Sequence, residues 1–146
     1  MLKWNNVPIP PQHLIGLVLG GVAQALSPRV LFANPLVGDL IGLPLIAAGI
    51  GLAVWSVRAA GKIDIESPDR LLVSGPYAFS RNPMYVGWTL LYLGIAFVVN
   101  SVWIASILVP VAAFTHSFDV RREERVLGGQ FGDDYVEYQR QVRRYI

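Results

Sequence analysis

Long segments without charged side chains are the feature of this sequence that most restricts its fold. A membrane-spanning helix needs roughly 20 mostly apolar residues. Four nearly uncharged segments approach that length, at about residues 11–28, 38–60, 84–99 and 101–118. We therefore predict an all-α, polytopic membrane protein that forms one domain over residues 1–146. The third and fourth spans are expected to form a tight helical hairpin.

The composition supports a membrane environment and excludes several other classes of protein. Hydrophobic residues make up 53% of the chain and charged residues only 15%, whereas a typical soluble domain has about 25% charged residues. So little charge argues against a disordered chain, an ordinary soluble domain and a nucleic-acid binder. The absence of cysteine excludes disulfides and thiol catalysis. His13 and His116 are far apart in sequence, and no metal site is expected.

The basic residues predict how the spans are oriented. With four spans, Lys3, the loop at 58–81 and the C-terminal tail share one side, which then holds eleven of the twelve Lys and Arg residues. Arg29 alone lies on the opposite side. Because positive charge collects in cytoplasmic segments, we predict cytoplasmic N- and C-termini, and compactness favours a prokaryotic cytoplasmic membrane. Residues 3–25 imitate a secretory signal only weakly, so no cleavage is expected.

Small residues four positions apart predict where helices approach closely. The pairs are Gly16 and Gly20, Gly38 and Gly42, and Ala47 and Gly51. Such pairs allow close helix contacts in lipid. We expect them to pack helices within the chain. Homo-oligomerisation through the same faces is the alternative, and the oligomeric state stays open.

The first polar cluster lies at residues 72–87, at the predicted cytoplasmic boundary. Gly75-Pro76 indicates a turn, and Asn82 before Pro83 predicts the N-cap and first residue of a helix. The positive end of that helix lies beside Arg81. The helix end and the arginine together predict an anion site. The alternative is that Arg81 only anchors the helix at the membrane edge.

The second polar cluster follows the fourth span, at about residues 116–145. The helix is expected to continue to a C-cap at Gly128-Gly129. It carries Glu123 and Glu124 about one turn beyond the membrane edge, and one carboxylate is expected to face a ligand. The alternative is a solvated helix end in which Arg121, Arg122 and Arg125 neutralise the two charges.

An amphipathic helix is predicted after those glycines. Phe131, Tyr135, Tyr138 and Val142 follow helical spacing. This helix is expected to lie on anionic lipid headgroups or to cover the cytoplasmic mouth of a pocket, and both roles are compatible.

These two clusters together resemble a known group of enzymes. GPYAFSRNPMYVG, followed one hairpin later by EERVLGGQFGDDYVEYQRQVRRY, is similar to the isoprenylcysteine carboxyl methyltransferase and phospholipid methyltransferase superfamily of integral membrane proteins. The similarity covers roughly residues 72–145. One position departs from the family pattern, because Asn82 stands where that pattern has histidine. Asparagine keeps a hydrogen-bonding group but cannot take up a proton near neutral pH.

The resemblance implies a methyltransferase that uses S-adenosylmethionine from the cytoplasm. The acceptor would be a lipophilic small molecule or lipidated substrate that enters from the bilayer, among membrane lipids. Arg81, Arg121 and Glu124 are implied to act directly in the reaction. The implied cofactor-binding residues are Gly75, Tyr77, Arg81, Asn82, Pro83, Tyr85, Gly87, Glu123, Glu124 and Tyr135.

Several reactions are compatible with this resemblance. Carboxyl O-methylation of an isoprenylcysteine-like molecule is the leading candidate, because an ionised carboxylate needs no catalytic base. Methylation of a phospholipid headgroup amine is the alternative within the superfamily. Outside it, the C-terminal pattern also resembles sterol reductases, which use a nicotinamide cofactor but are much longer. A non-enzymatic membrane scaffold is the remaining alternative.

Overall fold

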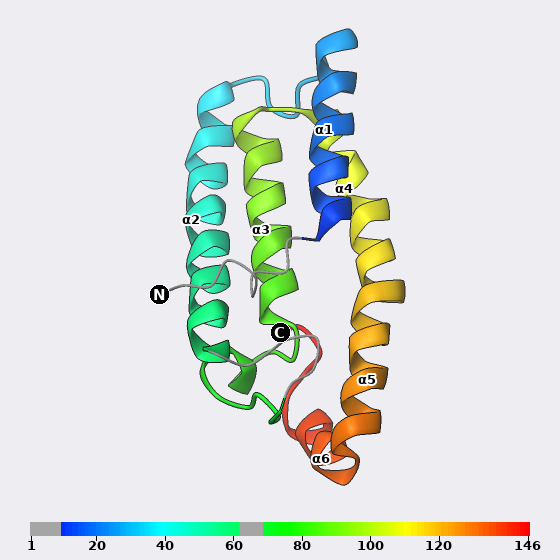
Figure 1. Cartoon of the computed structure of the whole chain (residues 1–146). Coiled ribbons are helices and arrows are strands. Elements are labelled where there is room, and N and C mark those ends of the chain that lie inside the picture. The colour runs from blue at the N-terminus through cyan, green and yellow to red at the C-terminus, as the bar shows by residue number, and fades with distance from the viewer. Residues whose placement is uncertain (1–9, 62–68) are drawn as a thin grey trace.

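The computed structural model describes residues 10–61 and 69–146, and every regular element in these ranges is helical. Helices α1 (Pro11–Leu26), α2 (Pro35–Ala60) and α3 (Pro83–Val98) run alongside one long helical column (Figure 1). That column consists of α4 (Val102–Phe114), the π-helical segment η3 (Thr115–Val120) and α5 (Arg121–Phe131). Helix α6 (Asp133–Gln141) and the short 3₁₀ helix η2 (Gly75–Ala78) lie at one end of the bundle. The all-helical prediction is therefore confirmed for the described residues.

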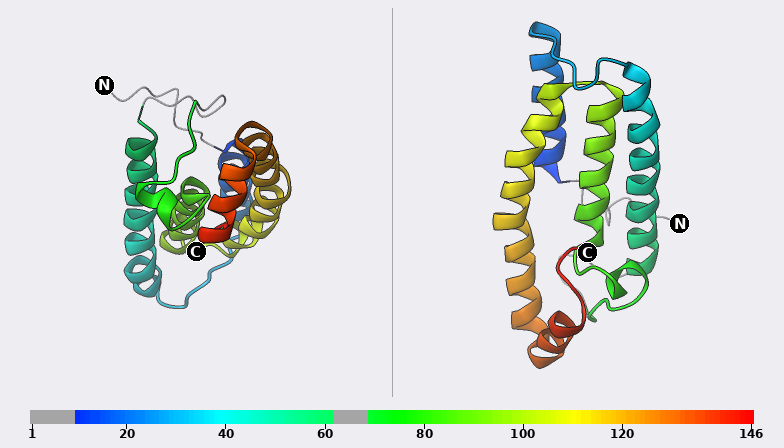
Figure 2. Two further views of the ribbon diagram at one scale, coloured as in Figure 1. Left: turned by 90° about the horizontal axis from the view of Figure 1, so that it is seen from below. Right: turned by 180° about the vertical axis from the view of Figure 1, so that it is seen from behind.

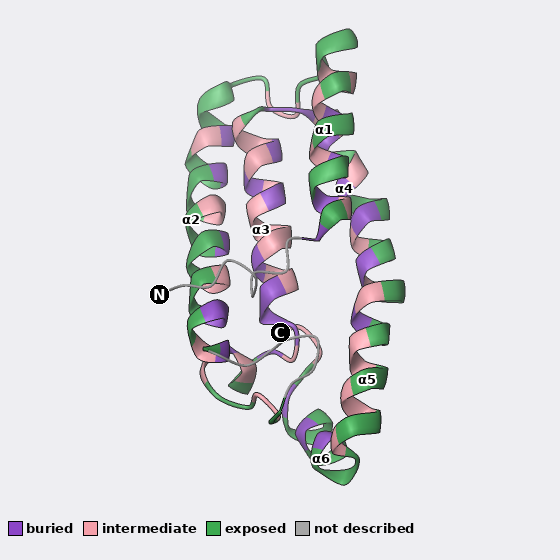
Figure 3. Cartoon of the chain, viewed as in Figure 1, coloured by how far each residue is buried: buried purple, intermediate pink, exposed green. Residues whose placement is uncertain are grey.

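All four predicted apolar segments are helical, but they differ in length. Helix α2 has 26 residues and the column from Val102 to Phe131 has 30, and both are long and apolar enough to cross a membrane. Helices α1 and α3 have 16 residues each, which is shorter than the roughly 20 that a perpendicular span needs. The helices carry many exposed residues on their outer faces (Figure 3). Large apolar residues are among the exposed ones, for example Val18, Leu40 and Val109.

The tight turn between α3 and α4 is present and is joined to the α1–α2 loop. Asn100 has a positive φ of 54°, and Ser101 caps α4 by accepting a hydrogen bond from the Ile104 N–H at 3.2 Å. The Asn100 side chain accepts from the N–H groups of Leu31 and Phe32 at 3.0 and 2.8 Å. Its amide also donates to the Phe32 carbonyl at 2.9 Å. These bonds close the end of the bundle that carries Arg29.

Glycines bring α2 and α3 into backbone contact, and this is the most extensive helix interface. A Cβ atom at Gly42 would lie 2.7 Å from the Gly94 carbonyl oxygen, and one at Gly49 would lie 2.7 Å from that of Gly87. The predicted roles of Gly38 and Gly42 in helix packing fit this interface, and Gly16 and Gly20 pack on α4. The prediction for Ala47 and Gly51 is wrong, because Gly51 faces open space and Gly49 makes the contact.

The C-terminal helix begins later than the sequence indicated. Gly128 and Gly129 lie inside α5, and the helix ends instead at Gly132, which adopts φ 52° and ψ −122°. Only glycine adopts that conformation readily, whereas a glycine inside a helix costs about 1 kcal/mol and does not have to end it. Tyr135 and Tyr138 of α6 pack with Leu127 and Phe131 of α5. Helix α6 therefore folds back against the bundle.

The predicted charge asymmetry is visible in the arrangement of the described elements. The C-terminal end of α2, the start of α3 and α6 lie at one end of the bundle, and the α1–α2 loop with Arg29 lies at the other (Figure 1). Lys3, Lys62 and the part of the signal-like segment that precedes Pro10 lie outside the described residues.

Replacement of Gly49 by alanine is expected to destabilise the protein, because the new methyl group would meet backbone atoms of α3. We expect the free energy of unfolding to fall by about 1–3 kcal/mol, as overpacking typically costs. Gly51→Ala in the same helix is the matched control and should be neutral or slightly stabilising, since its methyl group meets no described atom within 4 Å. Thermal unfolding in detergent, followed by circular dichroism, measures the difference. Equal melting temperatures for the two variants would contradict the packing described here.

Candidate functional site

The segment before α3 fixes the position of Arg81. Gly75, at φ 62°, begins η2 and packs against Trp55 and Ala59 of α2. Ser80 and Asn82 on either side of Arg81 are buried, and Pro83 is the first residue of α3. Asn82 occupies the N-cap position as predicted, but its side chain makes no capping hydrogen bond. Its amide donates instead to the carbonyl of Arg144, at 3.1 Å.

Arg81, Glu124 and Arg144 form a group of three charged side chains where α3, α5 and the C-terminal tail meet. The Arg81 Nη1 lies 3.1 Å from Glu124 Oε1, and both side chains are only 11% exposed. Arg144 binds both oxygens of Glu124, with Nε at 3.0 Å from Oε1 and Nη2 at 2.7 Å from Oε2. This bond to Glu124 raises the pKa of Arg144. The buried Nε of Arg81 has no hydrogen-bond partner within the described part of the chain.

The neighbouring glutamate faces a different partner. The Tyr85 hydroxyl, on the first turn of α3, donates to Glu123 Oε1 at 2.6 Å. Burial raises the pKa of Tyr77 to about 12, and the nearby charge of Glu123 contributes to the shift. Both glutamates therefore point into the junction between α3 and α5. The sequence had left open which of them does so.

Helix α6 supplies the wall below this junction. The Tyr138 hydroxyl donates to the Tyr77 carbonyl at 2.6 Å. Tyr135 is 2% exposed, and burial raises its pKa, with Glu124 adding to the shift and Arg81 opposing it. Both tyrosine hydroxyls therefore stay protonated far above neutral pH. The role predicted for this helix, a cover over a cytoplasmic pocket, stays a prediction.

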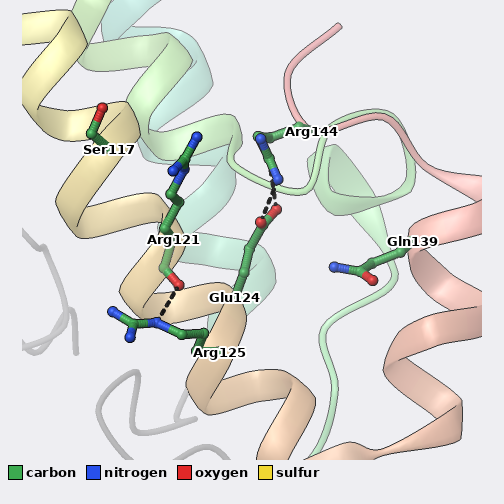
Figure 4. Close-up of a pocket in the computed structure, with 6 residues that line it drawn as sticks. All are labelled: Ser117, Arg121, Glu124, Arg125, Gln139 and Arg144. Carbon is green, nitrogen blue, oxygen red and sulfur yellow. Dashed lines mark hydrogen bonds and ion pairs between the residues drawn. The ribbon is translucent and has the colours of Figure 1, made fainter.

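An open cavity of about 650 Å³ adjoins Glu124 and Arg144 of this group (Figure 4). The side chains of Glu124 and Arg144 point toward each other in it, and Arg121 lies beside them. The Nε of Arg125 donates to the Arg121 carbonyl at 3.3 Å. The cavity is lined by Ser117, Arg121, Glu124, Arg125, Gln139 and Arg144. Three of these six are cationic, so the cavity favours an anionic group.

The structure brings most, but not all, of the implied cofactor-binding residues together. Arg81, Tyr77, Tyr85 and both glutamates surround the junction described above, and Tyr135 lies beside Arg81. The two glycines instead serve helix packing: Gly75 contacts Trp55, and a Cβ at Gly87 would lie 3.0 Å from the Gly49 carbonyl oxygen. The cofactor contact implied for these two glycines stays a prediction.

The last residues of the chain contribute to the site in a way that their sequence did not predict. Arg144 reaches Glu124, and the Tyr145 hydroxyl lies 2.7 Å from His116 Nδ1. The available signal was the run Arg143-Arg144-Tyr145, which was interpreted only as positive charge near a membrane. A basic run says nothing about which acidic residue it meets in the folded chain.

A second polar group lies deeper in the bundle, at the start of α1. The Gln12 amide donates to Thr115 Oγ1 at 2.9 Å and also to Asp119 of η3. His13 and Tyr92 are each 1% exposed, with ring centroids 6.1 Å apart. Neither ring nitrogen of His13 nor the Tyr92 hydroxyl has a hydrogen-bond partner among residues 10–61 and 69–146. These ranges contain no cluster of three possible metal ligands.

Glu124→Gln is expected to destabilise the protein strongly, because it leaves two guanidinium groups without their anionic partner. Removing one member of a buried ion pair costs about 3–5 kcal/mol. We expect a loss near the lower limit, since the Arg144 side chain is 35% exposed. Glu137→Gln is the matched control: its pair with Arg140 spans 3.6 Å and is largely exposed, so the change should stay within about 0.5 kcal/mol. Chemical denaturation in detergent measures both, and equal losses would contradict the burial of Glu124.

Comparison with known proteins gives two matches. A family model described as phospholipid methyltransferase matches residues 38–134, from α2 into α6. The cobalt-zinc-cadmium resistance protein CzcN of Cupriavidus metallidurans is 31% identical over 105 residues, which is 71% of this chain and 48% of that protein. The chain thus spans about half the length of this curated relative. The chain belongs to the phospholipid methyltransferase family of membrane proteins, within the superfamily that also contains the isoprenylcysteine carboxyl methyltransferases.

Proposed function

We propose that this protein is a multi-pass membrane enzyme that transfers a methyl group from S-adenosylmethionine to a lipophilic acceptor. The observation that carries the proposal is the contact of Arg81 and Glu124, whose side chains are each 11% exposed, with the more exposed Arg144 beside an open cavity. Four spans with cytoplasmic termini in a prokaryotic membrane are part of the proposal. It is supported by the grouping of Arg58, Arg70 and Arg81 at the end of the bundle opposite Arg29.

The charges at the junction match the amino-acid part of the proposed cofactor. That part carries a carboxylate and an ammonium group, and the junction offers two guanidinium groups and one carboxylate. The Nε of Arg81 is a buried donor without a partner in the described residues, which fits a cofactor carboxylate at the positive end of α3. Glu124 is suited to the ammonium group.

The aromatic residues around the junction fit the rest of the cofactor. Tyr77 and Tyr85 are partly exposed and suit packing of an adenine or a positively charged sulfonium, whereas Tyr135, also implied in cofactor binding, is almost fully buried. When bound, the cofactor supplies a methyl group that is open to nucleophilic attack. The role left to the chain is to align the acceptor with that methyl group and to exclude water.

A carboxylate acceptor is the leading proposal for the substrate. Arg121 and Arg125 line the cavity and have no carboxylate partner among the described residues, so they can orient an anionic acceptor. A carboxylate is ionised at neutral pH and needs no base, which agrees with asparagine at position 82. The substrate proposed on this ground is an isoprenylcysteine-like molecule or another lipophilic acid from the bilayer.

A phospholipid headgroup amine is the second candidate, and the description of the matching family favours it. An ammonium group has to lose a proton before it can attack. Glu124 is one of the residues implied to act directly in the reaction, but it is already paired with two guanidinium groups. Glu123 has the neutral Tyr85 hydroxyl as its hydrogen-bond partner. We therefore assign the role of base in an amine reaction to Glu123.

Arg81→Ala and Glu124→Ala are each expected to raise the dissociation constant for S-adenosylmethionine at least tenfold. A hydrogen bond to a charged group contributes about 1.5–3 kcal/mol, and about 1.4 kcal/mol corresponds to a factor of ten. Calorimetry on the detergent-purified protein measures this, and Arg140→Ala on the exposed face of α6 should stay within about twofold of the wild type. If both site variants bound S-adenosylmethionine with wild-type affinity, this would contradict the assignment of the site. Stabilisation by a nicotinamide cofactor but not by S-adenosylmethionine would favour a reductase.

The acceptor class can be identified with cofactor that carries a labelled methyl group. After incubation with membranes, a carboxyl methyl ester should release volatile label in base, because ester bonds hydrolyse readily under these conditions. Label that stays in the lipid fraction after base treatment would indicate N-methylation instead. Glu123→Gln adds a second criterion, since it should slow N-methylation much more strongly than ester formation. A protein that transfers no label to either class would contradict the proposed activity.

A further inference from the structure

We propose that Asn82 is a positioning residue that holds the C-terminal tail, defined as residues 142–146, so that Arg144 completes the cofactor site. This inference rests on the proposed function. Asn82 is not assigned any proton transfer or direct contact with the reacting atoms. Its task is to fix one carbonyl group of the tail.

Three consecutive residues before α3 donate hydrogen bonds to two consecutive carbonyls of the tail. The Arg81 N–H donates to the Arg143 carbonyl at 3.0 Å. The Asn82 amide donates to the Arg144 carbonyl at 3.1 Å, and the Ser80 hydroxyl approaches the same oxygen at 3.4 Å. Ser80 and Asn82 are 5% and 7% exposed. Without the Asn82 amide, the Arg144 carbonyl would keep only the longer contact with Ser80, so this hydrogen bond is costly to lose.

Arg144 is consequently held at both ends. Its carbonyl is fixed by Asn82, and its guanidinium binds both oxygens of Glu124 on α5. The next residue, Tyr145, reaches His116 of η3. The tail therefore connects the start of α3 to the helical column, and Figure 2 shows it running between them.

The position of Arg144 gives this connection a role in binding. Arg144 lines the cavity of about 650 Å³, and its side chain is 35% exposed, compared with 11% for Arg81. Of the two guanidinium groups, Arg144 is thus the one that a ligand in the cavity meets more directly. An arginine binds a carboxylate best when its planar group is held in one orientation. Holding the backbone of Arg144 supplies that orientation.

This role also accounts for asparagine where the family pattern has histidine. Asparagine has an amide donor at every pH, and an imidazole also offers an N–H donor. A donor to the tail carbonyl is therefore retained, whereas a proton-accepting group is not. If position 82 acts by anchoring the tail, histidine should replace asparagine with little loss.

A double-mutant cycle between Asn82 and Arg144 tests the inference. Arg144→Ala should weaken binding of S-adenosylmethionine about tenfold and Asn82→Ala about fivefold, as expected for the loss of a charged and a neutral hydrogen bond. Because Asn82 acts through Arg144, the double variant should bind within about twofold of Arg144→Ala rather than showing the product of both effects. Asn82→His should bind within about threefold of the wild type. Independent, multiplicative effects would overturn the inference.

Hydrogen exchange of the tail gives a readout that does not depend on the cofactor. Asn82→Ala and the isosteric Asn82→Asp should both speed amide exchange in residues 142–146, and one of them suffices if the other does not fold. Asn34→Ala is the matched control, because Asn34 caps α2 at the opposite end of the bundle. It should lower the melting temperature without changing tail exchange or cofactor affinity. Unchanged tail exchange in the Asn82 variants would refute the anchor. A wild-type protein that does not bind S-adenosylmethionine would refute the proposed function instead.

Discussion

Two arginines from distant parts of the chain meet at a single carboxylate at one end of the bundle. Glu124 lies between Arg81, which precedes α3, and Arg144, which follows α6. Buried charges are costly unless each is paired, so these three side chains require one another in place. Because they come from three separated parts of the chain, their pairing also sets how α3, α5 and the tail meet. The cavity exists beside this contact, and every proposed role of the site follows from it.

The rest of the fold is arranged so that this end can be polar while the remainder is apolar. Backbone glycine contacts join α2 to α3 without any charged group, as expected where lipid surrounds the helices. The opposite end is closed by neutral hydrogen bonds from Asn100 and Ser101. Charged residues are thereby concentrated where the cavity opens. This division agrees with a cofactor that arrives from water and an acceptor that arrives from lipid.

The sequence was most informative where a local pattern determines the structure. Proline at a helix start and long uncharged segments located the four helices to within a few residues, and the resemblance to a family singled out Arg81 and both glutamates. The Asn82–Arg144 contact could not be predicted, because it joins residues 62 positions apart. Gly51 was chosen over Gly49 because spacing alone does not reveal which helix face meets a neighbour. The sequence predicted the end of α5 at Gly128-Gly129 rather than at Gly132, because each of these glycines permits a turn. Only the packing of α6 selects Gly132.

The π-helical segment Thr115–Val120 has a consequence for how related sequences are compared. A π-turn holds one residue more than an α-turn, so it rotates everything after it by about 100° relative to a continuous α-helix. Glu123 and Glu124 owe their directions toward Tyr85 and Arg81 to that extra residue. A homologue with a one-residue deletion within this segment would present different side chains to α3, even if both glutamates were conserved. Alignment gaps here therefore carry more information about the site than substitutions nearby.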